Sequence, residues 1–304
     1  DLAEVALARR DPASAGGLLD SAIALDPDQA RPYIYRAGLR LDRADLTGAL
    51  ADAETGQRQA TPAIRPYALA AMVAVRTALA ETSPADYSDC EVVRDEAVSR
   101  DGTRVPITLL RRRGIALNGS HPTILYGYGG YGVCQTPTFR CRLRAWIERG
   151  GAFAVAHVRG GGEFGETWHR GGSLEHKQNV FDDFAACARR LVAAGYATRR
   201  KLSLMGGSNG GLLMGAMITQ HPDLARAVVS LVGLYDMLRV ERTPNGAYNV
   251  PEFGTVLDPK MFRVLHDYSP YHRVRDGVAY PSILMATGEN DPRVDSWQSR
   301  KMIA

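Results

Sequence analysis

Residues 202–213 read LSLMGGSNGGLL, and this stretch decides the fold. Its first residues have the composition of a short buried strand, and its last residues begin an apolar helix. Between them, the hydroxyl of Ser208 stands at the tip of a turn of small residues, in the pattern G-x-S-x-G of a nucleophile elbow. Gly206 and Gly210 allow the sharp turn, and the N–H groups that begin the helix point to the same place. The stretch therefore predicts a serine nucleophile at the end of a strand.

Short apolar runs alternate with helical segments on both sides of this turn. Besides the strand of the elbow, the predicted buried strands are 123–126, 152–156, 227–232 and 282–286. Residues 140–149 and 179–194 predict helices, and a hairpin with its turn at Asp101-Gly102 precedes them, with strands at 91–93 and 105–110. This alternation predicts a doubly wound, mostly parallel α/β sheet covered by helices. Functional groups are expected at the carboxyl ends of the strands.

The first 80 residues have a different pattern, rich in Ala, Leu and Arg at helical spacing. The tripeptide at 31–33, Arg-Pro-Tyr, recurs 34 residues later at 65–67. A 34-residue period of paired helices resembles the tetratricopeptide repeat family. An unrelated helical bundle is the alternative. We therefore expect helical repeats over 1–80, a linker over 81–90 and an α/β domain over 91–304.

Composition excludes several classes of function. The net charge of +4 comes from 37 basic and 33 acidic residues, and basic and aromatic residues are not interleaved as in nucleic-acid-binding surfaces. The four cysteines lack the spacing of a metal site, and no apolar run is long enough to predict a membrane span. Neither a phosphate-binding nor a dinucleotide-binding glycine motif occurs, so we expect no cofactor. We expect a cytoplasmic location; because the chain begins at Asp1, a periplasmic or secreted protein stays open.

Three loops that follow predicted strands carry reactive or charged side chains. They read GYGGYG at 127–132, RGGGEFGE at 159–166 and TGENDPRV at 287–294. Together with the KQN at 177–179 and the YSP at 268–270, in this order, they resemble the catalytic domain of the prolyl oligopeptidase family of serine peptidases over about 86–304. We expect Arg159 and Glu163 to pair and hold the second loop, with His157 as a further anchor.

The resemblance implies an α/β-hydrolase fold and a role for each matching residue. Ser208 would be the nucleophile, and Asp291 the acid that orients a catalytic histidine. The phenol of Tyr128 and the backbone N–H of Asn209 would bind the oxyanion, and Arg293 would hold a substrate carbonyl. The implied walls of a proline pocket are Tyr131, Leu234, Val294, Tyr248 and Phe253. The implied activity is hydrolysis of short peptides after proline through an acyl-enzyme, with a peptide as substrate and no metal.

The sequence departs from the family's pattern in three ways. All seven histidines precede Asp291, whereas on this fold the catalytic histidine follows the acid. We therefore expect the chain to stop before that histidine, and the polypeptide itself to be inactive. The propeller that usually precedes the domain has no counterpart, because the helical segment directly precedes residue 86. The family's tryptophan near Tyr248 is also absent, which weakens a strict preference for proline.

Two other functions stay open at this stage. An enzyme with the same triad could hydrolyse esters or acyl-peptides instead. A protein of a different class would be non-catalytic and would bind a protein partner through its helical repeats. The absent histidine favours that second alternative, whereas the joint presence of Ser208, Tyr128, Asp291 and Arg293 opposes it.

Overall fold

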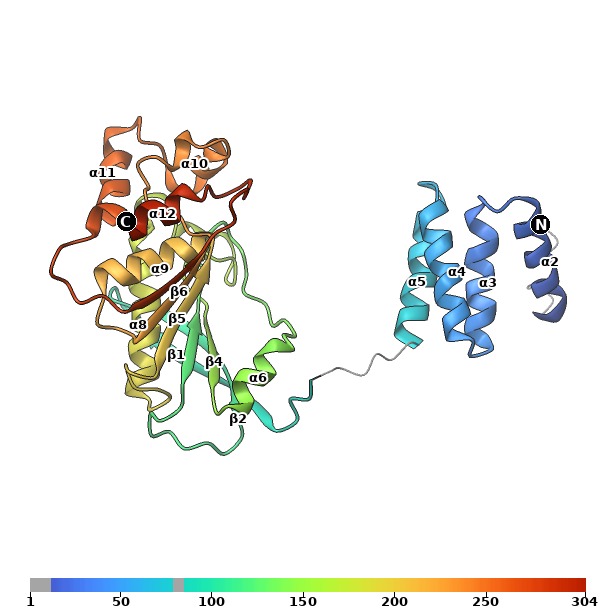
Figure 1. The fold of residues 1–304 in the computed structure, drawn as a ribbon, viewed down its shortest axis with the longest axis horizontal. Helices are drawn as coiled ribbons and strands as arrows, with labels where there is room; N and C mark the ends of the chain where they lie inside the picture. Colours follow the sequence, from blue (N-terminus) through green and yellow to red (C-terminus); the bar gives the residue numbers. More distant parts are fainter. Residues whose placement is uncertain (1–11, 79–84) are drawn as a thin grey trace. The chain divides into compact units, whose positions relative to one another are not determined.

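The computed structural model describes residues 12–78 and 85–304, which fall into two compact units, 1–84 and 85–304. The helical unit contains the helices α2 (Pro12–Leu25), α3 (Ala30–Asp42), α4 (Leu46–Gln59) and α5 (Arg65–Ala78). Consecutive helices lie side by side (Figure 1). Small side chains at their interfaces, among them Ala37, Ala49 and Ala53, are fully buried and let the helices approach closely.

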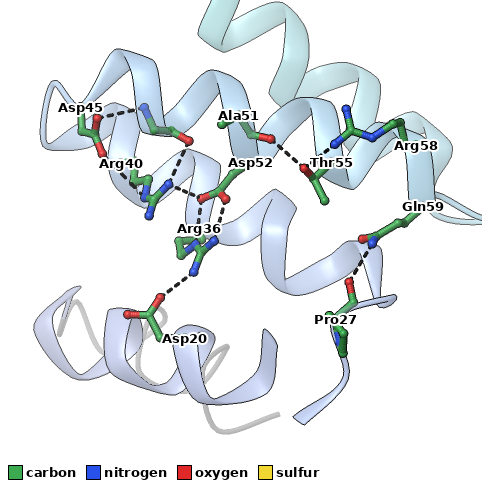
Figure 2. Close-up of polar contacts among 11 residues, drawn as sticks. Asp20, Pro27, Arg36, Arg40, Asp45, Ala51, Asp52, Thr55, Arg58 and Gln59 are labelled. Carbon is green, nitrogen blue, oxygen red and sulfur yellow. Dashed lines mark hydrogen bonds and ion pairs between the residues drawn. The ribbon is translucent and has the colours of Figure 1, made fainter. Parts of the chain in front are cut away.

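A buried carboxylate ties three of these helices together. Asp52 of α4 accepts hydrogen bonds from the Arg36 Nε and Nη2 atoms of α3 at 2.8 and 2.7 Å. Arg40 Nη1 lies 3.1 Å from the same carboxylate, and Arg36 also bonds Asp20 of α2 at 2.7 Å (Figure 2). A buried carboxylate needs such partners because it has left water. Ion pairs as well as packing therefore fix the relative positions of these helices.

The second unit is built on a seven-stranded sheet in the order β1-β2-β4-β3-β5-β6-β7. Its strands are β1 (Cys90–Val98), β2 (Arg104–Arg112), β3 (Thr123–Tyr126), β4 (Ala152–Ala156), β5 (Leu202–Gly207), β6 (Ala227–Leu231) and β7 (Ser282–Ala286). β2 pairs antiparallel with β1 and β4, and all later pairings are parallel. The predicted mostly parallel α/β-hydrolase sheet is confirmed, and β1 is longer than the sequence predicts because it pairs with β2 along nine residues.

Helices and short 3₁₀ segments surround this sheet. The α-helices are α6 (Arg142–Glu148), α7 (Glu166–Arg170), α8 (Gln178–Ala193), α9 (Asn209–Gln220), α10 (Val250–Phe253), α11 (Pro259–Tyr268) and α12 (Trp297–Ile303), and the 3₁₀ segments are η1 (Leu174–His176), η2 (Val240–Arg242), η3 (Gly246–Asn249) and η4 (Tyr271–Arg273). α9 follows the elbow and is buried from residue 209 to 218, while α8 packs Phe181 and Phe184 into the same core. In the described ranges no helix has the length and apolarity to span a membrane.

Candidate active site

Ser208 occupies a strained turn between β5 and α9. Its backbone has φ +57° and ψ −118°, a conformation that a residue with a side chain rarely adopts and that concentrates at functional sites. The turn is held from both sides: the Ser208 N–H donates to Leu231 O of β6 at 2.9 Å, and its carbonyl accepts from the N–H of Gly211 at 2.8 Å. The Ser208 side chain is only half-buried, so that a substrate can reach it.

The glycines beside Ser208 are required by close backbone contacts. A Cβ at Gly206 would lie 2.3 Å from the carbonyl oxygen of Gly210, and one at Gly210 would lie 2.6 Å from that of Gly127. Real Cβ atoms do not approach backbone oxygens so closely. The elbow and the loop after β3 are thus pressed together, and only glycine fits between them.

That loop brings the phenol of Tyr128 to the nucleophile. The Tyr128 hydroxyl lies close enough to the Ser208 side chain for Ser208 to affect the pKa of the phenol. Burial raises the pKa of the phenol, and the nearby Ser208 hydroxyl offsets part of that rise. The phenol therefore keeps its proton at neutral pH and remains a donor.

The second donor expected at an oxyanion site lies in the first turn of α9. The N–H of Asn209 is one of the first N–H groups of α9, which have no acceptor within the helix. The side chain of Asn209 is buried, and its Nδ2 donates to the carbonyl of Tyr128 at 2.5 Å. This bond links α9 to the Tyr128 loop, so the structure brings Ser208, Tyr128 and Asn209 together.

The residues expected to line the pocket differ in how deeply they are buried. Tyr131 and Phe253 meet edge to face with ring centroids 5.8 Å apart, and the Tyr131 hydroxyl donates to Asn249 Oδ1 at 2.7 Å. Leu234 and Val294 are buried in the main core. Tyr248, in contrast, is 79% exposed, because η3 turns its side chain into solvent and buries its neighbour Asn249 instead. Asn249, which the sequence analysis does not single out, thus contacts the predicted pocket residue Tyr131.

The acid expected from the sequence lies on an exposed loop after β7. Asp291 Oδ1 accepts hydrogen bonds from the backbone N–H groups of Arg293 and Val294 at 2.8 and 3.0 Å. These two bonds lower the pKa of the Asp291 carboxyl below its usual range, so it is a carboxylate at neutral pH. The exposed Arg293 guanidinium is near enough to Tyr128 to lower the pKa of that phenol slightly.

The histidines in the described part of the chain make their polar contacts elsewhere. His157 bonds Thr108 Oγ1 through Nε2 at 2.8 Å and approaches Glu163 through Nδ1 at 3.5 Å. It is thus the loop anchor that the sequence predicts. His169 bonds Glu252. None of the hydrogen bonds of the described residues joins a histidine to Ser208 or Asp291.

The predicted pairing of Arg159 with Glu163 is wrong. Arg159 Nη2 lies 2.6 Å from Asp183 Oδ1 of α8, and its Nη1 lies 2.6 Å from Asp101. Asp183 is completely buried and accepts from both the side chain and the backbone N–H of Arg159. Such a carboxylate takes the nearest cation because it has no water to solvate it. Glu163 instead accepts from the backbone N–H of Gln135 at 2.8 Å.

Comparison with known proteins covers the α/β unit. The family described as "Prolyl oligopeptidase family" matches residues 137–304. An uncharacterized peptidase of Sinorhizobium fredii is 46% identical over 209 residues, 68% of this chain and 29% of that protein. A prolyl endopeptidase of Elizabethkingia miricola is 43% identical over 197 residues, 64% of this chain and 28% of that protein.

Solved structures agree with these sequence matches. A structure from a study of two prolyl endopeptidases superimposes with a TM-score of 0.72 at 45% identity and covers 73% of this chain and 33% of that one. Prolyl oligopeptidase B from Galerina marginata gives a TM-score of 0.71 at 36% identity, over 73% of this chain and 32% of that one. The chain thus spans about a third or less of the length of the relatives it matches.

Proposed function

The chain belongs to the prolyl oligopeptidase family, and from this membership we propose that its α/β unit is the catalytic domain of a serine peptidase that cleaves short peptides after proline. One observation carries the proposal. Ser208 stands on a strained elbow, with the phenol of Tyr128 close to its side chain and the first N–H of α9 beside it. A nucleophile with two such donors is the arrangement that acyl transfer requires.

The chemistry proceeds through an acyl-enzyme. Ser208 Oγ attacks the carbonyl carbon of the scissile bond while a general base takes the hydroxyl proton. The carbonyl oxygen becomes an oxyanion and accepts from the Tyr128 phenol and the Asn209 N–H. The intermediate collapses, the amine leaves with a proton, and water then releases the acyl group from Ser208. No hydrogen bond of the described residues joins a histidine to Ser208, so we expect a base from solution to perform the proton transfer in this polypeptide.

The aromatic ring that follows the Tyr128 loop supports proline as the residue that is recognised. The exposed ring of Tyr131 packs edge to face on the buried Phe253 and offers an apolar aromatic face, which suits a pyrrolidine ring without a hydrogen-bond donor. The Asn249 amide is held by the Tyr131 hydroxyl, so its oxygen does not need a donor from the substrate. Arg293 is exposed at the same site and is available to bind a backbone carbonyl of the peptide.

A labelling experiment tests this function. The chain is incubated with a fluorophosphonate in the presence and absence of imidazole, and the modified residue is identified by mass spectrometry. We expect slow modification of Ser208 that imidazole accelerates, and none in Ser208→Ala. Nitroanilides and esters of acyl-Gly-Pro and acyl-Gly-Ala then separate a peptidase from an esterase. Modification at a site other than Ser208, or equal turnover of the proline and alanine substrates, would contradict the proposal.

For the helical unit, we propose a protein partner that inserts a peptide between α3 and α5. A cavity of about 260 Å³ there is lined by Arg31, Ile34, Tyr35, Ile64, Tyr67 and Ala70. The ring of Tyr67 is 68% exposed at this cavity. Peptides selected on the full chain from a random library should lose binding with Tyr67→Ala and retain it with Ser208→Ala. If the selected peptides bind Tyr67→Ala as tightly as the unmodified chain, the proposal is wrong.

A further inference from the structure

A fully buried lysine connects the Tyr128 loop to the buried segment on which Tyr131 packs. Lys177 lies directly before α8, and its Nζ donates to the carbonyl of Gly129 at 3.0 Å. The same Nζ donates to Glu252 Oε1 of α10 at 2.8 Å and lies 5.0 Å from the ring centroid of Phe253. Gly129 follows Tyr128, and Phe253 follows Glu252. One ammonium group therefore bonds to the Tyr128 loop and to the buried segment on which the exposed Tyr131 ring packs.

Both partners of this lysine are held in place as well. The second oxygen of Glu252 is 2.9 Å from His169 Nε2, so each oxygen of this carboxylate has a partner. Gly129 has φ +66°, and a Cβ there would lie 2.3 Å from Val180 of α8. The Gly129 peptide therefore lies tightly against the beginning of α8, where its carbonyl accepts a hydrogen bond from Lys177. Neither segment can shift without breaking a contact with the lysine.

Stability alone does not account for such a group. Burial lowers the pKa of Lys177, and the charge of Glu252 offsets this only in part. A buried pair of this kind adds little to stability, because the loss of hydration cancels most of the attraction. Its contribution lies in geometry, since charge-assisted hydrogen bonds fix the distance between the atoms they join.

We propose that Lys177 is a positioning residue that sets the phenol of Tyr128 relative to the exposed ring of Tyr131, which packs on the buried Phe253, so that a substrate held against the Tyr131 ring presents its carbonyl to the phenol. The inference rests on the proposed function, because it assigns Tyr128 to the oxyanion. Lys177 itself does not touch the substrate. It acts through the Gly129 carbonyl on one side and through Glu252 on the other.

Two ligands separate this role from a structural one. An acyl-prolyl boronic acid binds in the pocket and also forms a B–O bond with Ser208 Oγ, whose proton goes to solvent, which places a tetrahedral oxygen at the oxyanion position. The matching acyl-prolinamide binds in the pocket alone. The ratio of their two dissociation constants therefore measures the oxyanion site, and it can be measured on the full chain without turnover.

We expect the full chain to bind the boronate more tightly than the amide. Lys177→Met should reduce this preference roughly 10- to 100-fold, the effect expected when a reacting group moves by about 1 Å. The double variant Lys177→Met/Glu252→Gln leaves no unpaired charge, so its Tm should recover relative to Lys177→Met while the preference stays low. Lys301→Met, which removes a lysine from the buried Asp236 of the same unit, should leave the preference unchanged.

The possible failures are distinguishable. If Lys177→Met lowers the Tm but keeps the boronate preference within twofold, Lys177 is structural and the inference is wrong. The same conclusion follows if the double variant regains the preference together with its Tm. If the unmodified chain itself binds boronate and amide equally, the proposed function fails, and the inference fails with it.

Discussion

The ends of β5 and β7 lie in one sheet but are built in opposite ways. At the end of β5, Ser208 is surrounded by backbone from β6, from α9 and from the Tyr128 loop. At the end of β7, Asp291 lies on an exposed loop, and among the described residues its carboxylate accepts hydrogen bonds only from backbone N–H groups of its own turn. β7 is the edge strand of the described sheet, and its Leu284 is 60% exposed.

This difference separates the two halves of the proposed chemistry. The parts that attack the carbonyl and stabilise the oxyanion are packed together and hold one another. The parts expected to move the proton are not joined in the described structure, where no hydrogen bond links Asp291 to a histidine. The experiments below test that contrast, from its largest expected effect to its smallest.

The largest effect concerns the base. Without a histidine beside Ser208, hydrolysis of an acyl-prolyl nitroanilide should be on the order of 10⁶-fold slower than in serine proteases with a complete triad. Imidazole in solution should raise the rate by roughly 10²-fold, the lower end of what a general base contributes. Initial rates at increasing imidazole concentration measure this, with Ser208→Ala as the control. Rapid turnover without imidazole would show that a described residue already acts as the base.

The next effect concerns the phenol at the β5 end. Tyr128→Phe should lower the imidazole-dependent rate by on the order of 10²-fold, because it removes one of two oxyanion donors. Since the pKa of Tyr128 is raised, the difference between the two proteins should persist as the pH rises through about 10, where an ordinary tyrosine ionises. Rates of both proteins from pH 7 to 11 measure this. A Tyr128→Phe rate within threefold of the unmodified chain would remove the phenol from the mechanism.

Parts of the site whose residues lie close together in the sequence can be predicted from it, whereas parts built from residues far apart in the sequence cannot. The elbow is local: Gly206, Ser208 and Gly210 lie within five residues, so strand, turn and helix can be predicted together. Lys177 and Glu252 are 75 residues apart, and each alone reads as a surface charge. Only the fold shows that they meet in the interior.

The pocket shows the same limit at closer range. The family resemblance implies Tyr248 as a pocket wall, but the 3₁₀ turn of η3 exposes Tyr248 and buries Asn249 instead. Likewise, Arg159 was paired with a neighbour in sequence, whereas its partner Asp183 comes from α8. Sequence patterns identify which loops meet at the site. They do not determine which side chains of those loops point inward, because tertiary contacts decide that.

A smaller effect, on the free energy of unfolding, is expected from the difference in packing between the two strand ends. Gly206→Ala should lower the free energy of unfolding of the α/β unit by about 1–3 kcal/mol, because its Cβ would collide with the Gly210 carbonyl. Gly288→Ala, on the loop before Asp291, should change it by less than about 0.5 kcal/mol, because its nearest contact would be at 3.6 Å. All three tryptophans lie in the α/β unit, so their fluorescence during urea unfolding reports on that unit alone. Equal losses in both variants would mean that the two strand ends are packed alike.

The smallest effect is expected at Asp291 itself. Asp291→Asn keeps an oxygen that can accept from the N–H groups of Arg293 and Val294, so the turn should persist and the imidazole-dependent rate should change by less than about twofold. The pKa of Asp291 is lowered in the folded chain, so the carboxylate stabilises it above about pH 4, and this small contribution disappears as the pH falls. The Tm of the variant should therefore approach that of the unmodified chain in acid, and rates and melting curves at pH 7 and pH 3.5 measure both effects. A rate loss of tenfold or more at pH 7 would show that Asp291 already takes part in proton transfer without a histidine, and the contrast between the ends of β5 and β7 would no longer hold.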